Sequence, residues 1–426
     1  MRALVSHSAA VNDLADTPFA EAPASAQPLR QRGSNQGGVR QFNERVVLQA
    51  LRAHGALAKA DLARLTGLTA QTIGLITARL DEDQLLTKGE PVRGKVGQPS
   101  VPIGLNPDGA FAIGIKIARR SADWLLVDFT GAVRERISVA YHFPDATTLL
   151  PLIQRNLDEL LRRLGPLAPR VVGVGVAAPF QLGGWHRMLG LTEAQSDAWN
   201  HLDLAAEVQR MTHLPVSFAK DTAAACVAEL LQGKGREIHS FLYLFLDTFV
   251  GGGLVLHSHL HRGEHGNAGA VASLPLGVAG GAAADLKEVP PQLISQASLW
   301  DLEQRLREHG LDPMAAYDAR ALQAPWLPHT RQWIDRAALA LAHCIVSGTA
   351  FLDLEAVVID GVVAPDLLAD LIERTQQALS AYNWEGLQTP PPLCAGSIGS
   401  DARALGGALL PLHASFAPDR DLFLKT

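Results

Sequence analysis

A similar order of apolar segments occurs twice in this chain of 426 residues, and it limits the possible folds more than any other feature. In its first occurrence, three short strand-like segments precede a long amphipathic segment and a continuous apolar run. The strand-like segments are Ala112–Ile117, Trp124–Asp128 and Val133–Val139. The amphipathic segment, from about Asp145 to Leu164, predicts a helix, and the run Val171–Ala177 is typical of a buried parallel strand.

The second occurrence begins after residue 240. It comprises strands at Phe241–Leu246 and Leu254–His257, long helical segments, and a last strand at Ala356–Ile359. Three antiparallel strands, a helix and a further strand form the start of a ribonuclease-H-like lobe. Two such lobes predict an α/β protein of actin-like or hexokinase-like architecture with a ligand cleft between them.

Charge is distributed unevenly along the chain. The whole chain has a net charge of −6, whereas residues 30–100 hold eleven Lys and Arg against six Asp and Glu. A basic segment on an acidic body suggests an anion-binding module, although chance surface charge would explain the count equally well. Residues 1–38 predict a disordered tail without a secretory signal. The absence of a long apolar run and of paired cysteines favours a cytoplasmic protein that does not enter membranes.

The basic segment has the pattern of a helix-turn-helix. Asn43 can cap a first helix that ends at His54-Gly55, and Lys59–Leu65 predicts a short second helix. Thr66-Gly67-Leu68 is a tight turn, and Thr69 can cap a third helix that continues to about Leu80. In this motif the last helix enters the DNA major groove through its N-terminal residues.

The predicted DNA contacts follow from that geometry. Gln suits a bidentate contact with adenine, and Thr suits the thymine methyl group. A two-stranded wing is expected from Leu85 to Pro99. The predicted DNA-binding residues are Thr69, Gln71, Thr72, Arg40, Lys59, Arg64, Arg93 and Lys95. A helical hairpin that contacts a partner protein is the alternative, and the basic residues of the wing favour DNA.

Taken in order, these features resemble the ROK family of bacterial sugar-responsive repressors and related sugar kinases. The resemblance covers residues 40–426. Its motifs are Asp61–Thr69, Val171–Val176 with Pro179, Trp199, Asp221, Thr248 with Gly251–Gly253, and Gly399–Ala408. It implies a winged helix-turn-helix at 39–100 and a first lobe at 101–219 that the C-terminal helix 400–426 completes. The second lobe, at 220–399, is expected to oligomerise the chain as a homodimer or homotetramer.

The departures from the family's kinase motifs concern nucleotide binding. Family kinases open the first lobe with an Asp-Gly-Gly-Thr loop, whereas this chain has Lys116–Arg120 there. In the second phosphate loop, Asp247 and Phe249 occupy positions that are normally glycine, and Asp360 replaces the first glycine of the adenosine-side motif. Asp221 remains at the place of the catalytic base, where it could equally be a helix cap or a ligand contact. These departures predict a protein without kinase activity.

The sugar and zinc motifs of the family are also changed. Ala270 and Ser273 stand where its Glu-x-Gly-His motif begins and ends, and no cysteine occurs between Cys226 and Cys344 for its zinc site. Lys220 replaces an asparagine that normally contacts sugar, which favours an anion. The implied ligand-contact residues are Lys220, Asp221, Asn267 and Ser273.

A run of histidines is the remaining candidate for metal binding. His257, His259 and His261 alternate on an expected strand, with His265 nearby. Such a face could bind a transition metal, but it lacks Cys or carboxylate support and also fits a solvated hairpin. No metal and no cofactor are therefore predicted.

The sequence thus predicts a DNA-binding transcriptional regulator, a repressor by resemblance, that binds a duplex operator and senses a sugar or an anion. The alternative is a sugar kinase that carries an N-terminal DNA-binding domain. A third hypothesis is a body that regulates through a protein partner. An intact phosphate loop would favour the kinase, and a sealed cleft would favour the protein-binding body.

Overall fold

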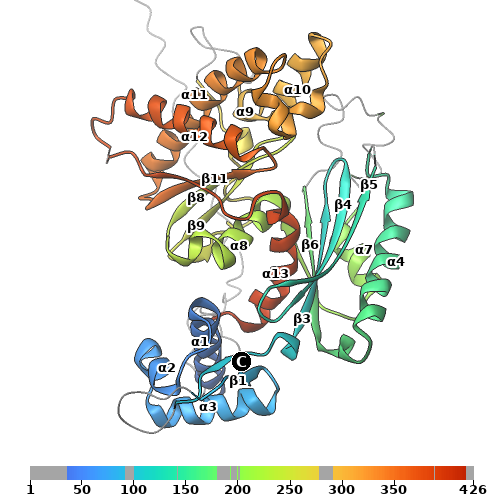
Figure 1. Ribbon diagram of the computed structural model, residues 1–426, viewed down its shortest axis with the longest axis vertical. Coiled ribbons are helices and arrows are strands. Elements are labelled where there is room, and N and C mark those ends of the chain that lie inside the picture. The colour runs from blue at the N-terminus through green and yellow to red at the C-terminus, as the bar shows by residue number, and fades with distance from the viewer. Residues whose placement is uncertain are drawn as a thin grey trace, which may run out of the picture. The chain divides into compact units, whose positions relative to one another are not determined.

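The computed structural model describes residues 36–91, 100–141, 143–179, 192, 199, 202–277, 291–387 and 389–418. Its first elements, called the head below, are three helices and a two-stranded antiparallel sheet (Figure 1). They are α1 (Gln36–His54), α2 (Lys59–Thr66), α3 (Ala70–Glu82), β1 (Leu86–Lys88) and β2 (Ile103–Leu105). Thr69 caps α3 as predicted, since its side chain accepts a hydrogen bond from the backbone N–H of Thr72 at 3.1 Å.

Two predictions for the head are wrong. Helix α1 begins at Gln36, so Asn43 lies inside it and does not cap it, because one cap-type residue is a weak signal when the preceding residues can extend the helix. The second strand of the hairpin begins at Ile103, beyond the predicted wing. Burial selects this register, because Ile103 is 4% exposed and exchanges backbone hydrogen bonds of 2.8 and 2.9 Å with Leu57.

The first five-stranded sheet has the order β5-β4-β3-β6-β7. Its strands are β3 (Phe111–Ile117), β4 (Ser121–Asp128), β5 (Val133–Ala140), β6 (Val171–Ala178) and β7 (Val216–Lys220). Strands β3, β4 and β5 are antiparallel, whereas β6 and β7 run parallel to β3. The amphipathic helix α4 (Ala146–Leu164) packs Leu149, Ile153 and Leu157 into the same core cluster as Trp124. Helix α7 (Leu204–Met211) and the short helices η1 (Pro107–Gly109) and η2 (Gly165–Arg170) complete this lobe. The predicted strands and helix are confirmed.

The second sheet has the order β10-β9-β8-β11-β12. Its strands are β8 (Phe241–Leu246), β9 (Gly251–Leu256), β10 (His259–Leu260), β11 (Ala356–Gly361) and β12 (Leu393–Ala395). Its α-helices are α8 (Asp221–Gln232), α9 (Ile294–Ala297), α10 (Leu299–Glu308), α11 (Leu327–Phe351) and α12 (Pro365–Ser380). The short helices are η3 (Lys234–Arg236), η4 (Val271–Ser273), η5 (Pro313–Tyr317), η6 (Ala319–Leu322) and η7 (Gly399–Asp401).

Strand β9 begins three residues earlier than predicted. The prediction missed its first half because that half consists of three glycines. Glycine usually argues against a strand, but here it permits close packing of α8. A Cβ on Gly253 would lie 2.6 Å from the Cβ of Cys226.

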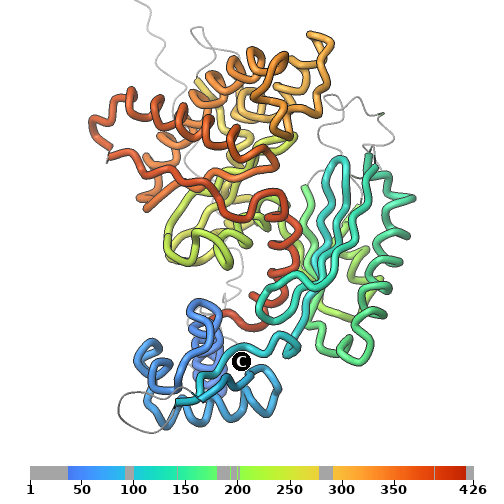
Figure 2. Tube along the Cα trace, in the orientation of Figure 1, coloured from blue at the N-terminus to red at the C-terminus, as the bar shows by residue number. Residues whose placement is uncertain are grey.

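The last helix, α13 (Ala402–Phe416), packs against β3 and β6 and against α8 (Figures 1 and 2). Glycines make this packing possible. A Cβ on Gly406 would lie 1.7 Å from the carbonyl oxygen of Ala224, and a Cβ on Gly175 would lie 1.9 Å from that of Gly407. Helices α8 and α13 therefore form a closely packed pair.

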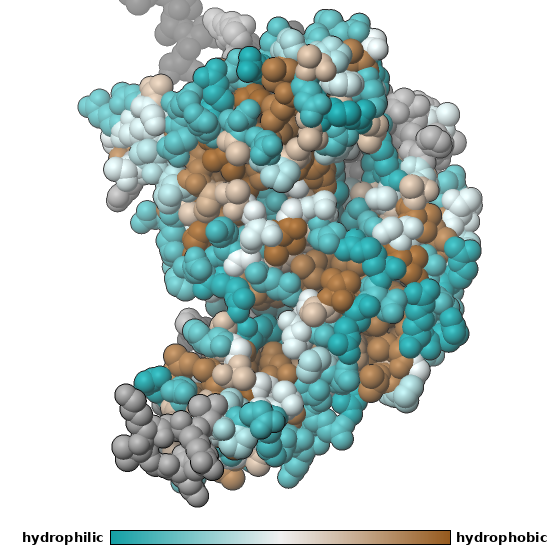
Figure 3. All heavy atoms as spheres, viewed as in Figure 1, coloured by the Kyte–Doolittle hydropathy of each residue, from teal (hydrophilic) through white to brown (hydrophobic). Residues whose placement is uncertain are grey.

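One described helix, α11, is long and apolar enough to cross a membrane by length and composition. Half of its most apolar stretch is buried inside the protein, where Trp333, Leu341 and Ile345 belong to the core of the second lobe. Helix α11 is therefore a core helix. The face drawn in Figure 3 mixes hydrophilic and hydrophobic side chains without one continuous apolar band.

Candidate functional site

A cavity of about 860 Å³ lies where turns and helix starts from both lobes meet. The turn between β3 and β4, the start of α8, the turn between β8 and β9, residues 265–273 and the start of α13 all contribute side chains. Small-molecule sites in proteins typically have volumes of roughly 300–1,000 Å³. The cavity is thus of the size expected for a ligand and lies in the predicted cleft.

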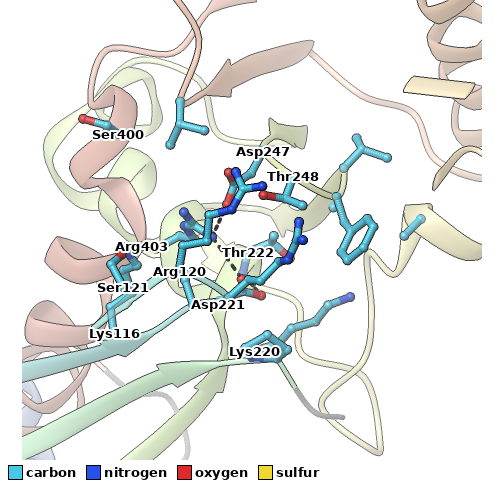
Figure 4. Close-up of a pocket in the computed structure, with 18 of the residues that line it drawn as sticks. Lys116, Arg120, Ser121, Lys220, Asp221, Thr222, Asp247, Thr248, Ser400 and Arg403 are labelled. Atoms are coloured by element: carbon cyan, nitrogen blue, oxygen red, sulfur yellow. Dashed lines mark hydrogen bonds and ion pairs between the residues drawn. The ribbon is translucent and has the colours of Figure 1, made fainter. Parts of the chain in front are cut away.

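Arg403 of α13 is the most buried charge in the cavity. Its Nη1 lies 2.5 Å from Oδ2 of Asp247 and 3.5 Å from Oδ2 of Asp221 (Figure 4). Burial alone would lower the pKa of Arg403, but the two carboxylates outweigh burial and raise that pKa above its usual value. Asp221, which the resemblance compares with the kinases' base, is therefore ion-paired. Sequence reasoning missed Arg403, although an arginine in an apolar helix is a detectable signal.

A second ion pair joins β3 and β4 beside the turn between them, which the family resemblance compares with the kinases' first phosphate loop. Lys116 Nζ donates to Oδ2 of Asp123 at 2.6 Å and to Oγ of Ser121 at 3.0 Å. Burial lowers the pKa of Lys116, and the nearby Arg403 lowers it further. Burial would raise the pKa of Asp123, but Lys116 outweighs it and holds that pKa below its usual value. Both charges are thus compensated within the first lobe.

Arg120, from the same turn, reaches α10 in the second lobe. Its Nη1 and Nη2 donate to Oε1 and Oε2 of Glu303 at 3.1 and 2.8 Å. Glu303 is fully buried and also accepts hydrogen bonds from Tyr317 at 2.6 Å and Arg307 at 2.5 Å. Burial would raise the pKa of Glu303, but these donors hold it below its usual value. Glu303 was not predicted, although its spacing from Leu299 places a charge on the buried face of α10.

The four predicted ligand-contact residues, Lys220, Asp221, Asn267 and Ser273, all line this one cavity. Lys220 and Asp221 lie at the junction of β7 and α8, whereas Asn267 and Ser273 come from the segment after β10 and are exposed. The structure thus brings together residues up to 53 positions apart in sequence. Their role as ligand contacts stays a prediction.

The prediction that the histidines alternate on one strand is wrong. His257 and Ser258 both have positive φ values, 52° and 63°, and form the tight turn between β9 and β10. Such turns usually contain Asn-Gly, so the sequence lacked the customary signal. His257 lies in this turn and His261 follows β10, so the three histidines do not lie on one strand. Among the residues that the structure describes, no three His, Cys, Asp or Glu side chains form a metal-binding group.

The predicted DNA-reading surface lies on the exposed side of α3. Gln71 is exposed, and Leu75 is 56% exposed. Thr72 is half-buried, and its hydroxyl lies 2.8 Å from that of Thr69, so its methyl group is the part left for a DNA contact.

Of the other predicted contacts, Arg40 lies in α1, and Lys59 and Arg64 lie in α2. Arg40, Lys59 and Arg64 are exposed, and Arg64 pairs with Asp61 at 2.8 Å. Arg93 and Lys95 lie outside the described residues.

Residues 112–413 match the ROK family, which covers both lobes and the cavity. The chain belongs to the ROK family. Among its relatives, an uncharacterized protein of Sinorhizobium fredii, y4fQ, is 24% identical over 88% of this chain and 92% of its own length. The xylose repressor of Bacillus subtilis is 20% identical over 55% of this chain, and the alignment spans 61% of that repressor.

Both regulators and kinases of the ROK family are similar to this protein. The N-acetylmannosamine kinase of Vibrio cholerae is 23% identical over 59% of this chain and 85% of the kinase. A crystal structure of a ROK transcriptional regulator, a homologue of the E. coli MLC protein, superposes with a TM-score of 0.67 at 20% identity. That match covers 91% of this chain and 98% of the regulator. The ROK hexokinase of Thermus thermophilus, at 22% identity and a TM-score of 0.52, covers 70% of this chain and 97% of the hexokinase. These likenesses show the fold.

In this ROK protein, α8 and α13 connect the cavity with the head. Helix α8 begins at Asp221 in the cavity, and beyond its end Arg236 Nη2 donates to the backbone carbonyls of residues 52 and 53 at 3.0 and 2.6 Å. Helix α13 carries Arg403 near its start, and the carbonyl of Ala417 after its end accepts a bond from Arg45 Nη1 at 3.1 Å. Each helix thus begins at the cavity and is followed, just beyond its end, by a residue that contacts α1.

Proposed function

We propose that this protein is a DNA-binding transcriptional regulator, a repressor by analogy with its relatives, whose ROK lobes bind an effector and do not phosphorylate sugar. The observation that supports this proposal most directly is that α8 and α13 connect the cavity to the head. A ligand that moves the start of either helix would move the support of α1 at the other end. Such a connection suits a regulator, because the effector must alter a distant DNA-binding surface.

We assign a function to each predicted domain. Residues 39–100 bind DNA, and the effector binds between a first lobe at 101–219, completed by the C-terminal helix, and a second lobe at 220–399. On DNA, we assign base reading to Gln71, with help from the methyl group of Thr72. Arg40, Lys59, Arg64, Arg93 and Lys95 are assigned to phosphates and the minor groove. A homodimer or homotetramer in the cytoplasm would place two heads on a palindromic operator.

The absence of kinase activity is proposed from the altered turns around the cavity. Phosphoryl transfer depends on positioning and neutralising the triphosphate. Here Arg120 is engaged by the buried Glu303, and Asp221 is paired with Arg403. Asp360 is also occupied by contacts within the protein, because its carboxylate accepts hydrogen bonds from the backbone N–H groups of Gly361 and Gly399 at 2.8 and 3.1 Å. The kinase alternative keeps one supporting observation, which is that Asp221 lines the cavity.

The test is selection of binding sites from a pool of random duplexes with the full-length protein, followed by footprinting on the enriched sequence. We expect a defined protected site whose affinity exceeds that of random DNA by at least about 10³-fold. Equal affinity for enriched and random duplexes would reject a sequence-specific regulator. If the protein binds neither enriched nor random duplexes, the protein-partner hypothesis is favoured.

A further inference from the structure

The charges that line the cavity do not cancel. Six cationic side chains and four carboxylates line it, which leaves a surplus of two positive charges with histidine neutral. Four of the cations have carboxylate partners, namely Lys116, Arg120, Arg136 and Arg403. In the part of the chain that the structure describes, the two lining cations without an ion pair are Lys220 and Arg119.

Lys220 is the first of these two cations. It lies at the junction of β7 and α8, beside Asp221 in Figure 4, but the Asp221 carboxylate pairs with Arg403 instead. Lys220 is half-buried, and burial lowers the pKa of its ammonium group. A partly desolvated ammonium without a counter-ion is unfavourable, and an anion in the cavity would remove that cost.

Arg119 is the second. Its guanidinium lies 4.5 Å from the ring centroid of Trp300, and this stacking holds it at the cavity wall. Its Nη1 is buried, and within the described residues it has no hydrogen-bond partner. The guanidinium as a whole lines the cavity without an ion-pair partner among the described residues, and carboxylates and phosphates are the groups that Arg binds best.

On the basis of the effector role proposed above, we infer that the cavity binds a small organic acid whose carboxylate or phosphate is recognised by Lys220 and Arg119. Phe143, Phe249 and Ile294, which also line the cavity, provide apolar contact for its carbon skeleton. A neutral sugar would leave both cations uncompensated. A nucleoside triphosphate carries more negative charge than this surplus balances, and it would meet Asp221 and Asp247.

The experiment measures thermal stability and calorimetric binding of the full-length protein with matched ligands. D-glucuronate, glucose 6-phosphate and inorganic phosphate are compared with D-glucose and with sodium chloride of equal ionic strength. At least one acid should raise the melting temperature, whereas glucose should not. Lys220→Gln and Arg119→Gln should each weaken binding of that acid about ten- to hundredfold, the usual loss for a charge-assisted hydrogen bond.

Arg331→Gln is the matched control, since Arg331 is exposed on α11 and does not line the cavity. Its affinity for the acid should equal that of the wild type. Melting without ligand reports whether each variant folds, and Lys220→Gln should melt no lower than the wild type because it removes a desolvated charge.

Three results would overturn the inference. They are stabilisation by glucose equal to that by the acids, no stabilisation by any acid or by phosphate, and unchanged acid affinity in Lys220→Gln and Arg119→Gln. Binding to the selected DNA site is measured in parallel. If one of these results occurs while specific DNA binding is retained, the anion-binding inference is rejected and the proposed regulatory function stands. If specific DNA binding is absent while an acid still stabilises the protein, the regulatory function is rejected and the anion site stands.

Discussion

Gln71 carries the most specific prediction at the residue scale. Its amide is exposed on the first turn of a capped helix, where a bidentate contact with adenine can form. Gln71→Ala should weaken binding to the selected site by about 1–3 kcal/mol and binding to random DNA very little. Lys59→Ala, a phosphate contact by our assignment, should weaken both and reduce the salt dependence. Equal losses on both DNAs for Gln71→Ala, measured by titration at fixed salt, would remove its base-reading role.

Arg403 provides a second residue-scale prediction, on stability. Arg403→Met would leave the Asp221 and Asp247 carboxylates facing each other in the cavity without their cation. Unfolding free energy at pH 7 should fall by about 3–5 kcal/mol. Denaturant titration at pH 7 tests this, with Arg331→Met expected to stay within about 0.5 kcal/mol of wild type. A loss no larger than that of Arg331→Met would contradict the electrostatic account.

At the scale of elements, two glycines in helices make a matched pair. A Cβ on Gly406 of α13 would lie 1.7 Å from the backbone of α8, whereas a Cβ on Gly74 of α3 would meet nothing within 4 Å. Gly406→Ala should cost at least about 2 kcal/mol through overpacking. Gly74→Ala should instead stabilise by roughly 0.5–1 kcal/mol, because alanine favours the helix. Chemical denaturation of both variants measures the difference. Similar effects in the two would mean that α8 and α13 can separate freely, which would weaken the proposed connection to the head.

At the scale of the whole molecule, the two lobes should bind a ligand without catalysing phosphoryl transfer. A coupled assay with ATP and glucose, N-acetylglucosamine, mannose or fructose should show no turnover above background. The reason is that Arg120 is tied to Glu303 and Asp221 to Arg403, so neither phosphate positioning nor a free base is provided. Turnover on the order of 1 per second that disappeared in Asp221→Asn would establish the kinase alternative.

The periodicity of the sequence was sufficient for most elements of this protein. Continuous apolar runs such as Val171–Ala177 and the capped helix after Thr69 depend on neighbours along the chain, so local patterns predict them. The order of motifs also identified the family. Predictions failed where a distant contact was decisive. Leu57 selected the strand at Ile103, and α8 allowed three glycines to begin β9.

The cavity shows the same division. The sequence by itself predicted that Lys220, Asp221, Asn267 and Ser273 stand at ligand-contact positions and that the glycine loops are altered. Only the tertiary structure decided which charges are compensated. Arg403 lies 182 residues from Asp221, and Arg120 lies 183 residues from Glu303, so no local pattern could pair them. Ion pairs depend on distance in space and on burial, and folding of both lobes sets both quantities.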